Sequence, residues 1–244
     1  MKIAGWRKVS FIDYPGKNST VVFTPGCNYR CPACHAKHLL ENRNLQNISE
    51  EEIFKYLDSR KGKIDAVVIC GGEPTLQAGL KYFCKKLKEK GLAVKLDTNG
   101  SEYIVLGDLL AGGLIDYVAM DVKGPPQIYA DLIGREFLDA RDGYEKAIAV
   151  VSQFSDYEFR TTVSPVVRRN GEISFMTAQE IGETAKLIYD CTGNREHKYF
   201  LQPFVPHKDG LVDSKLERFP KTPFELMEEM KKEARKYLPR CEIR

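Results

Sequence analysis

Short apolar runs alternate with amphipathic stretches along this chain, and this alternation limits its fold more than any other feature. The apolar runs predict strands at residues 20–24, 65–70, 92–97, 117–122, 157–163 and 198–204. The amphipathic stretches predict helices at residues 48–60, 76–90, 102–111, 141–154, 177–191 and 222–238. Strands and helices that alternate over short connections form a parallel sheet covered by helices.

Six such units are too few for the closed eight-stranded barrel. The pattern therefore predicts an α/β fold, either a partial (β/α)6 barrel with parallel strands or an open doubly wound sheet. We expect one domain over residues 1–244, in which residues 205–244 are a C-terminal extension that ends in a helix. Thr222 is the expected N-cap of that helix, with Pro223 at its first position. In either fold, ligands bind at the carboxyl ends of the strands.

Charge and hydropathy narrow the class of partner. The chain has 37 Lys and Arg against 34 Asp and Glu, and a net charge of +3 is too small to favour nucleic acid. No apolar run approaches the ~18 residues that a membrane span requires. The N-terminus also lacks the continuous apolar segment of a secretory signal. We therefore expect a cytoplasmic protein that has no membrane partner.

Three of the seven cysteines, Cys27, Cys31 and Cys34, lie close together directly after the first predicted strand. In a chain of this length their C-x3-C-x2-C spacing indicates metal binding rather than a disulfide framework. Three thiolates on one short loop can bind three irons of a [4Fe–4S] cluster and leave the fourth iron open. Structural zinc needs four ligands, and His35 or His38 would supply the fourth, so zinc remains the alternative.

Polar residues follow the next two predicted strands at the same edge of the sheet. Gly71-Gly72-Glu73 ends the second strand, where the glycines allow close approach of a ligand and the carboxylate can accept from an ammonium group. Asp97 and Asn99 end the third strand and can bond hydroxyl groups. By themselves, both segments are also good turn sequences.

The later strands carry charged candidates. Asp121 and Lys123 lie on the same face of the fourth strand, where they form either part of a site or a structural ion pair. Arg160 lies among apolar residues of the fifth strand and needs a partner. Gln202 at the end of the sixth strand and His207 after it are weaker candidates. The scattered cysteines at positions 70, 84, 191 and 241 predict no second cluster.

Together these motifs resemble those of radical S-adenosylmethionine enzymes. The resemblance implies a partial (β/α)6 barrel and a [4Fe–4S] cluster on the three motif cysteines, where S-adenosylmethionine is cleaved reductively to a 5′-deoxyadenosyl radical. It also implies that Gly71-Gly72-Glu73 meets the methionyl amino group, that Lys123 lies near the carboxylate, and that Arg160 points into the site. The family usually has an aromatic residue at the position of Ala33, so Tyr29 or another residue covers the adenine here.

Residues 12–16 (IDYPG) and 23–27 (FTPGC) resemble the activating proteins of anaerobic ribonucleotide reductase and, more widely, the pyruvate formate-lyase activases. This resemblance implies hydrogen abstraction from a backbone glycine of a partner glycyl-radical enzyme, with reduced ferredoxin or flavodoxin as electron donor. Where the activases have Cys-His-Asn, this chain has Cys34-His35-Ala36. Two alternatives remain, namely a radical enzyme that modifies a small molecule, an RNA base or a peptide, and a non-catalytic zinc-binding module.

Overall fold

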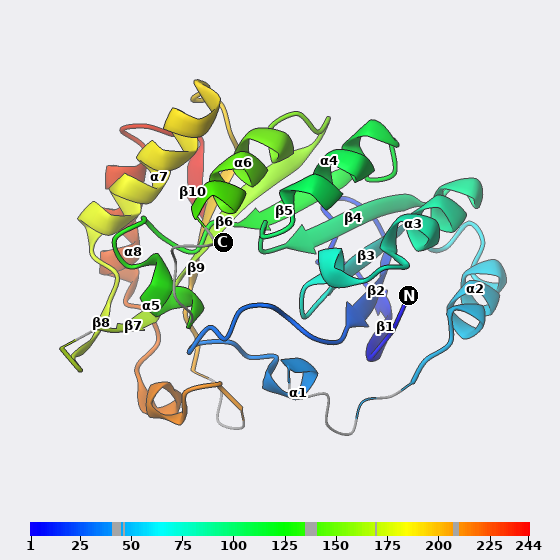
Figure 1. The fold of residues 1–244 in the computed structure, drawn as a ribbon, viewed down its shortest axis with the longest axis horizontal. Coiled ribbons are helices and arrows are strands. Elements are labelled where there is room, and N and C mark those ends of the chain that lie inside the picture. The colour runs from blue at the N-terminus through cyan, green and yellow to red at the C-terminus, as the bar shows by residue number, and fades with distance from the viewer. Residues whose placement is uncertain (41–44, 46, 135–140, 169, 207–209) are drawn as a thin grey trace.

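The computed structural model of the chain describes residues 1–40, 45, 47–134, 141–168, 170–206 and 210–244. A curved eight-stranded sheet forms its centre, in the order β1-β2-β3-β4-β5-β6-β9-β10 (Figure 1). The strands are β1 (Gly5–Ser10), β2 (Ser19–Thr24), β3 (Ala66–Gly71), β4 (Ala93–Thr98), β5 (Tyr117–Asp121), β6 (Tyr157–Val163), β9 (Tyr199–Pro203) and β10 (Cys241–Ile243). Neighbouring strands are parallel except for β1, which runs antiparallel to β2.

The longer helices lie along the outer face of this sheet (Figure 1). They are α2 (Glu50–Ser59), α3 (Leu80–Glu89), α4 (Tyr103–Ala111), α6 (Arg141–Val151), α7 (Ala178–Thr192) and α8 (Phe224–Ala234). The short helices α1 (Lys37–Leu40) and α5 (Tyr129–Ile133) lie on the opposite, concave side. A doubly wound sheet would carry long helices on both faces. The structure therefore confirms the partial (β/α)6 barrel.

Alternation along each strand separates two hydrophobic layers. In β3, Val67 and Ile69 belong to the large cluster that packs against the helices. Their neighbours Ala66 and Val68 face the inside of the barrel, in a smaller cluster with Tyr14 and other residues. In this smaller cluster, most side chains that face the inside of the barrel are small. Toward the carboxyl ends of the strands, the inward side chains become polar and charged.

The sequence did not predict β1 and β10. Residues 205–244 therefore end in a strand, not in a helix as expected, because α8 is followed by β10, which pairs with β9. A small separate hairpin of β7 (Pro165–Val167) and β8 (Ile173–Phe175) was also missed. Among the described residues, none of the helices has the length and apolar character that a membrane span requires.

Two predicted helix starts are wrong. Helix α8 begins at Phe224, so Thr222 lies outside it. Thr222 instead forms hydrogen bonds to two other segments of the chain. Its hydroxyl accepts from the Phe204 N–H at 2.8 Å and donates to the Val163 carbonyl at 2.9 Å. The helix predicted at 76–90 begins only at Leu80, as α3, and Leu76 instead ends a separate 3-10 turn at Pro74–Leu76 that Glu73 caps.

Candidate functional site

A cavity of about 590 Å³ lies at the carboxyl ends of the parallel strands. It brings together nearly all the residues that the sequence singled out, namely Cys27, Tyr29, Cys31, Cys34, Gly71, Gly72, Glu73, Asp97, Asn99, Asp121, Lys123 and Arg160. His35 and His38 line it as well. Gln202 lies in β9 and is not one of the lining residues. His207 lies outside the described residues.

The cysteine loop connects β2 to α1, and backbone hydrogen bonds fasten it to other parts of the chain. The Gly26 N–H donates to the Leu39 carbonyl at 2.9 Å, which closes the base of the loop. The Arg30 N–H donates to the carbonyl of Ile133, at the end of α5, at 2.8 Å. The loop is therefore held from two sides before any cofactor binds.

The two glycines at the end of β3 leave no space for a side chain, because Gly71 lies against the end of β2 and Gly72 lies against the cysteine loop. Gly71 has φ +115°, a conformation that favours glycine. A Cβ on Gly72 would lie 1.8 Å from the carbonyl oxygen of Gly26. The Gly72 N–H donates to the Thr24 carbonyl, and the Glu73 N–H donates to the Gly26 carbonyl, each at 2.8 Å. The sequence interpretation related these glycines to a ligand, and both line the cavity; the structure adds that Gly72 also accommodates the cysteine loop.

The Glu73 carboxylate is almost completely buried, with 1% of the residue exposed. Its Oε1 accepts from the Thr75 N–H at 3.1 Å, the Thr75 hydroxyl at 2.6 Å and the Thr98 hydroxyl at 2.7 Å. Its Oε2 accepts from the Asn99 N–H at 2.7 Å. Burial raises the pKa of Glu73, and these bonds act in the opposite direction. The carboxylate thus joins the ends of β3 and β4, a role that the sequence did not indicate.

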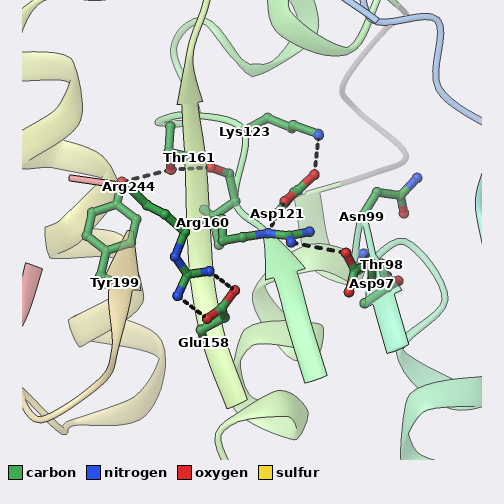
Figure 2. Close-up of polar contacts among 12 residues, drawn as sticks. Asp97, Thr98, Asn99, Asp121, Lys123, Glu158, Arg160, Thr161, Tyr199 and Arg244 are labelled. Carbon is green, nitrogen blue, oxygen red and sulfur yellow. Dashed lines mark hydrogen bonds and ion pairs between the residues drawn. The ribbon is translucent and has the colours of Figure 1, made fainter. Parts of the chain in front are cut away.

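Five charged side chains from neighbouring strands form one connected network, in which Lys95 Nζ lies 2.5 Å from Asp97 Oδ1. Figure 2 shows the contacts among the other members. Lys123 Nζ lies 2.7 Å from Asp121 Oδ2, and Arg160 Nε lies 2.9 Å from Asp121 Oδ1. The other end of the Arg160 guanidinium lies 3.1 Å from Asp97 Oδ2. Parallel pairing places Asp121 opposite Arg160, so the topology itself brings these charges together. The predicted acid and base on one strand face are therefore an ion pair within the cavity wall.

This network changes the acid–base behaviour of its members. Burial alone would raise the pKa of Asp121, but the charges of Lys123 and Arg160 outweigh it and hold that pKa well below its usual range. Burial alone would lower the pKa of Lys123, but Asp121 outweighs it and raises that pKa. Both side chains are consequently charged at neutral pH. Burial also raises the pKa of Cys31 to about 11, with Lys123 acting in the opposite direction.

The chemistry of the lining residues fits an iron–sulfur cluster together with an organic ligand. Three thiols from one loop line one cavity, and thiolates are the protein ligands that iron–sulfur clusters prefer. The ion-paired carboxylates and amides at the other side can bond the polar groups of a nucleoside or an amino acid. Among the described residues, no three His, Cys, Asp or Glu side chains converge as ligands of a single metal ion.

Sequence reasoning missed a second, apolar part of the cavity wall. It is lined by Ala4, Gly5, Phe23, Leu39 and Leu40. Gly5 belongs to β1, a strand whose exposed polar residues hide the apolar alternation, so no pattern pointed to it. Cys70, at the end of β3, also lines the cavity.

Comparison with known proteins gives the family. The sequence pattern of the Radical SAM superfamily matches residues 21–188. The chain belongs to the radical S-adenosylmethionine superfamily. Enzymes of this family use a [4Fe–4S] cluster and S-adenosylmethionine, which are therefore the cofactors of this chain. The zinc-binding module is thereby set aside, and the chain is an enzyme.

Two relatives carry different names. A protein of Methanocaldococcus jannaschii with the provisional name glycyl-radical enzyme activating enzyme is 35% identical over 99% of this chain and 95% of its own length. A protein of Thermococcus kodakarensis with the provisional name GTP 3′,8-cyclase is 30% identical over 84% of this chain and 66% of its own length. The family is therefore clear, but the names of these two relatives indicate different substrates.

The fold also resembles that of solved structures. The crystal structure of SuiB from Streptococcus suis bound to S-adenosylmethionine superposes with a TM-score of 0.64 at 12% identity. The match covers 92% of this chain and 51% of SuiB, so this chain spans about half the length of that protein. At so low an identity the likeness shows the fold alone.

Proposed function

We propose that this chain activates a glycyl-radical enzyme, by removing a hydrogen atom from a backbone glycine of that partner protein. The relative from Methanocaldococcus jannaschii supports this proposal, since the likeness extends over 95% of its length and its provisional name describes such an activity. The charge of the residues that line the cavity supports the same proposal.

The basic side chains among the described residues that line the cavity are two permanent cations, Lys123 and Arg160, and two histidines, His35 and His38. The two permanent cations stand against three carboxylates, Glu73, Asp97 and Asp121. Both cations are already paired, at 2.7 Å and at 2.9 and 3.1 Å. A nucleoside triphosphate such as GTP needs several cations for its phosphates. This wall therefore favours a substrate that is uncharged where it reacts, as a peptide glycine is.

The apolar part of the wall gives such a substrate a place beside the cofactors. Ala4, Gly5, Phe23, Leu39 and Leu40 offer no charge and little polarity to the reacting group. A glycine brings only backbone atoms and no charge, which suits a wall of this composition. We therefore infer that the partner's glycine loop enters along this side of the cavity.

The other residues have positioning roles in this proposal. Cys27, Cys31 and Cys34 bind the cluster, and Tyr29 packs beside them with 2% of its surface exposed. Asp97, Asn99, Asp121, Lys123 and Arg160 bond the polar groups of S-adenosylmethionine. When bound, the cluster and S-adenosylmethionine supply the one-electron reductive chemistry that makes a hydrogen-abstracting radical. A ferredoxin or a flavodoxin is the proposed electron donor.

The test is anaerobic and uses the partner directly. The protein is reconstituted with iron and sulfide, reduced, and mixed with S-adenosylmethionine and an anaerobic ribonucleotide reductase from the same organism. We expect 5′-deoxyadenosine and a glycyl-radical doublet in the paramagnetic resonance spectrum. Replacing the partner's radical-bearing glycine by alanine should remove the doublet, as should Cys31→Ala in this chain.

The same reaction with GTP in place of the partner protein tests the competing function. A cyclised nucleotide product that forms with 5′-deoxyadenosine, together with no doublet in any candidate partner, would overturn the proposal. Formation of 5′-deoxyadenosine under both conditions would still agree with the family, since that product reports only the cleavage of S-adenosylmethionine.

A further inference from the structure

A third hydrophobic cluster, separate from the two layers of the barrel, packs against the cysteine loop. Its buried members are Phe204, Leu211 and Leu216, with partly buried Ala33, Val167, Ile173, Phe175 and Phe219 around them. They come from three segments, namely the cysteine loop, the β7–β8 hairpin and the chain that follows β9. We refer to residues 210–222, which contribute Leu211, Leu216 and Phe219 to this cluster, as the C-terminal strap.

The strap is fixed to the barrel at its far end. The Thr222 N–H donates to the Phe204 carbonyl at 3.1 Å, and the Thr222 hydroxyl accepts from the Phe204 N–H. The same hydroxyl donates to the Val163 carbonyl at the end of β6. Leu211 and Leu216 are completely buried in the third cluster, which the strap shares with the hairpin and the cysteine loop. These contacts give it a defined position above the strand ends.

From this position the strap holds the turn that carries two of the cysteines. The Asp213 N–H donates to the Pro32 carbonyl at 3.0 Å. Pro32 lies between Cys31 and Cys34, and the Cys34 N–H donates to the Cys31 carbonyl at 3.0 Å. The turn is therefore closed by its own hydrogen bond and fastened to the strap by another.

Asp213 itself is held in place for this contact. Its carboxylate accepts from the Lys215 N–H at 2.9 Å and caps the 3-10 turn at Ser214–Arg218. That turn contains Leu216, which anchors it in the third cluster. The Ala33 side chain packs against the same cluster, so buried residues of the strap fill the space next to this position.

We propose that the C-terminal strap is a positioning element for the iron–sulfur cluster, which holds Cys31 and Cys34 in the arrangement that binds iron. The proposal rests on the assignment of these cysteines as cluster ligands and is independent of the substrate. Ligands that are already arranged lose less freedom when metal binds, and their supporting contacts raise affinity. The strap also covers one side of the turn against water and small solutes.

A merely structural role for the strap predicts something different. In that case a weakened strap would lower the stability of the fold but would not change the rate at which the folded protein loses iron. The two roles are separated by measuring iron release from the folded, cluster-loaded protein, independently of its activity. A ferrous chelator serves as the probe, and its coloured iron complex is followed under anaerobic conditions.

Two substitutions at one position isolate the hydrogen bond to Pro32. Asp213→Pro removes the N–H donor and the capping carboxylate, whereas Asp213→Ala removes only the carboxylate. We expect iron release from Asp213→Pro to be about tenfold faster than from the unmodified chain. Asp213→Ala should stay much closer to the unmodified chain. Equal rates for Asp213→Pro and Asp213→Ala would overturn the role of this hydrogen bond.

A second pair of variants tests the strap without a proline. Leu216→Ala weakens the third cluster, and Leu238→Ala removes an equally buried leucine of the large cluster. We expect faster iron release only from Leu216→Ala, with both proteins folded by circular dichroism and both loaded with iron and sulfide before the chelator is added. Equal release from the two leucine variants would show that general loss of stability, and not the strap, governs iron retention.

Discussion

The ionisation state of Asp121, at the carboxyl end of β5, is set by its two cationic neighbours. Lys123 and Arg160 both bond its carboxylate, and together they outweigh the effect of burial and hold its pKa well below the usual range. The side chain therefore remains an anion at every pH at which such an enzyme operates. Its role is to accept hydrogen bonds and to orient two cations, rather than to donate a proton.

The first prediction concerns Asp121→Asn and the dependence of stability on pH. Because the pKa of Asp121 is lower in the folded chain than the ~3.9 of an unfolded one, its contribution is complete above about pH 5 and is lost as pH falls. We expect the variant to be about 3 kcal/mol less stable at pH 7. Urea unfolding should show this difference shrinking toward pH 3. A difference that stays constant over this range would contradict the assignment.

The second prediction concerns an ion pair between a buried carboxylate and an arginine whose side chain is 43% exposed (Figure 2). Arg244 bonds both carboxylate oxygens of Glu158, at 2.8 and 2.9 Å, and Glu158 is completely buried. Arg244→Ala leaves this carboxylate without its cation and should lower the free energy of unfolding by about 3 kcal/mol.

The control for this pair is Arg240→Ala. Arg240 is exposed, and its guanidinium donates to the Glu196 carbonyl at 3.2 Å. We expect a change within about 0.5 kcal/mol for such a surface substitution. Equal free energies of unfolding for the two arginine variants, measured in urea, would show that the Glu158 pair adds nothing to stability.

At the scale of the elements, the junction between β3 and the cysteine loop leaves no space for a side chain. The third prediction is that Gly72→Ala disturbs this junction, because its Cβ would lie 1.8 Å from the Gly26 carbonyl oxygen. We expect a loss of about 1–3 kcal/mol in the free energy of unfolding and incomplete loading with iron and sulfide.

Gly107→Ala is the matched control for this substitution. Gly107 lies inside α4, and a Cβ there would have no atom within 4 Å. Since alanine favours helix over glycine, this variant should be more stable by about 0.5–1 kcal/mol and should load normally. Thermal unfolding measures the stability of both variants, and iron analysis measures how much cluster each one binds. Normal iron content in Gly72→Ala would contradict a junction that has no space for a side chain.

The elements that the sequence predicted correctly are those with strong local patterns. The parallel strands β3 and β5 are nearly continuous apolar runs, and α7 begins with a capping box at Thr177 and Glu180. By contrast, β1 has an exposed middle and β10 has three residues, so neither shows a clear alternation. Their strand conformation depends on pairing with β2 and β9, which local sequence does not encode.

The same distinction applies to the candidate site. Parallel topology brings all strand carboxyl ends to one edge, so residues such as Asp97, Asp121 and Arg160 were predictable from their place within or at the end of a predicted strand. The bonds of the Glu73 carboxylate to Thr98 and Asn99 were not, because they join segments far apart in the sequence. The contact of the strap with Pro32 is of the same kind.

At the scale of the whole molecule, the cysteine loop connects three distant parts of the chain. Its Gly26 carbonyl accepts from the Glu73 N–H, and its Arg30 N–H donates to the Ile133 carbonyl. Its Pro32 carbonyl accepts from the Asp213 N–H. A cofactor that fixes this loop therefore also restrains the end of β3, the end of α5 and the strap. Binding at one loop should stabilise regions that never contact the cofactor's ligands directly.

The last prediction tests this coupling by hydrogen exchange before and after anaerobic cluster loading. A ligand that binds only the closed form suppresses local opening. The amide hydrogens of Arg30, Glu73 and Asp213 should therefore exchange about tenfold more slowly in the loaded protein. The Asp116 N–H, which donates to the Val94 carbonyl at 2.8 Å near the amino ends of the strands, serves as the control and should change little. Slower exchange confined to residues 27–34, Arg30 included, with no change at Glu73 and Asp213, would mean that loading orders only the loop and that its hydrogen bonds to Glu73 and Asp213 do not restrain the rest of the fold.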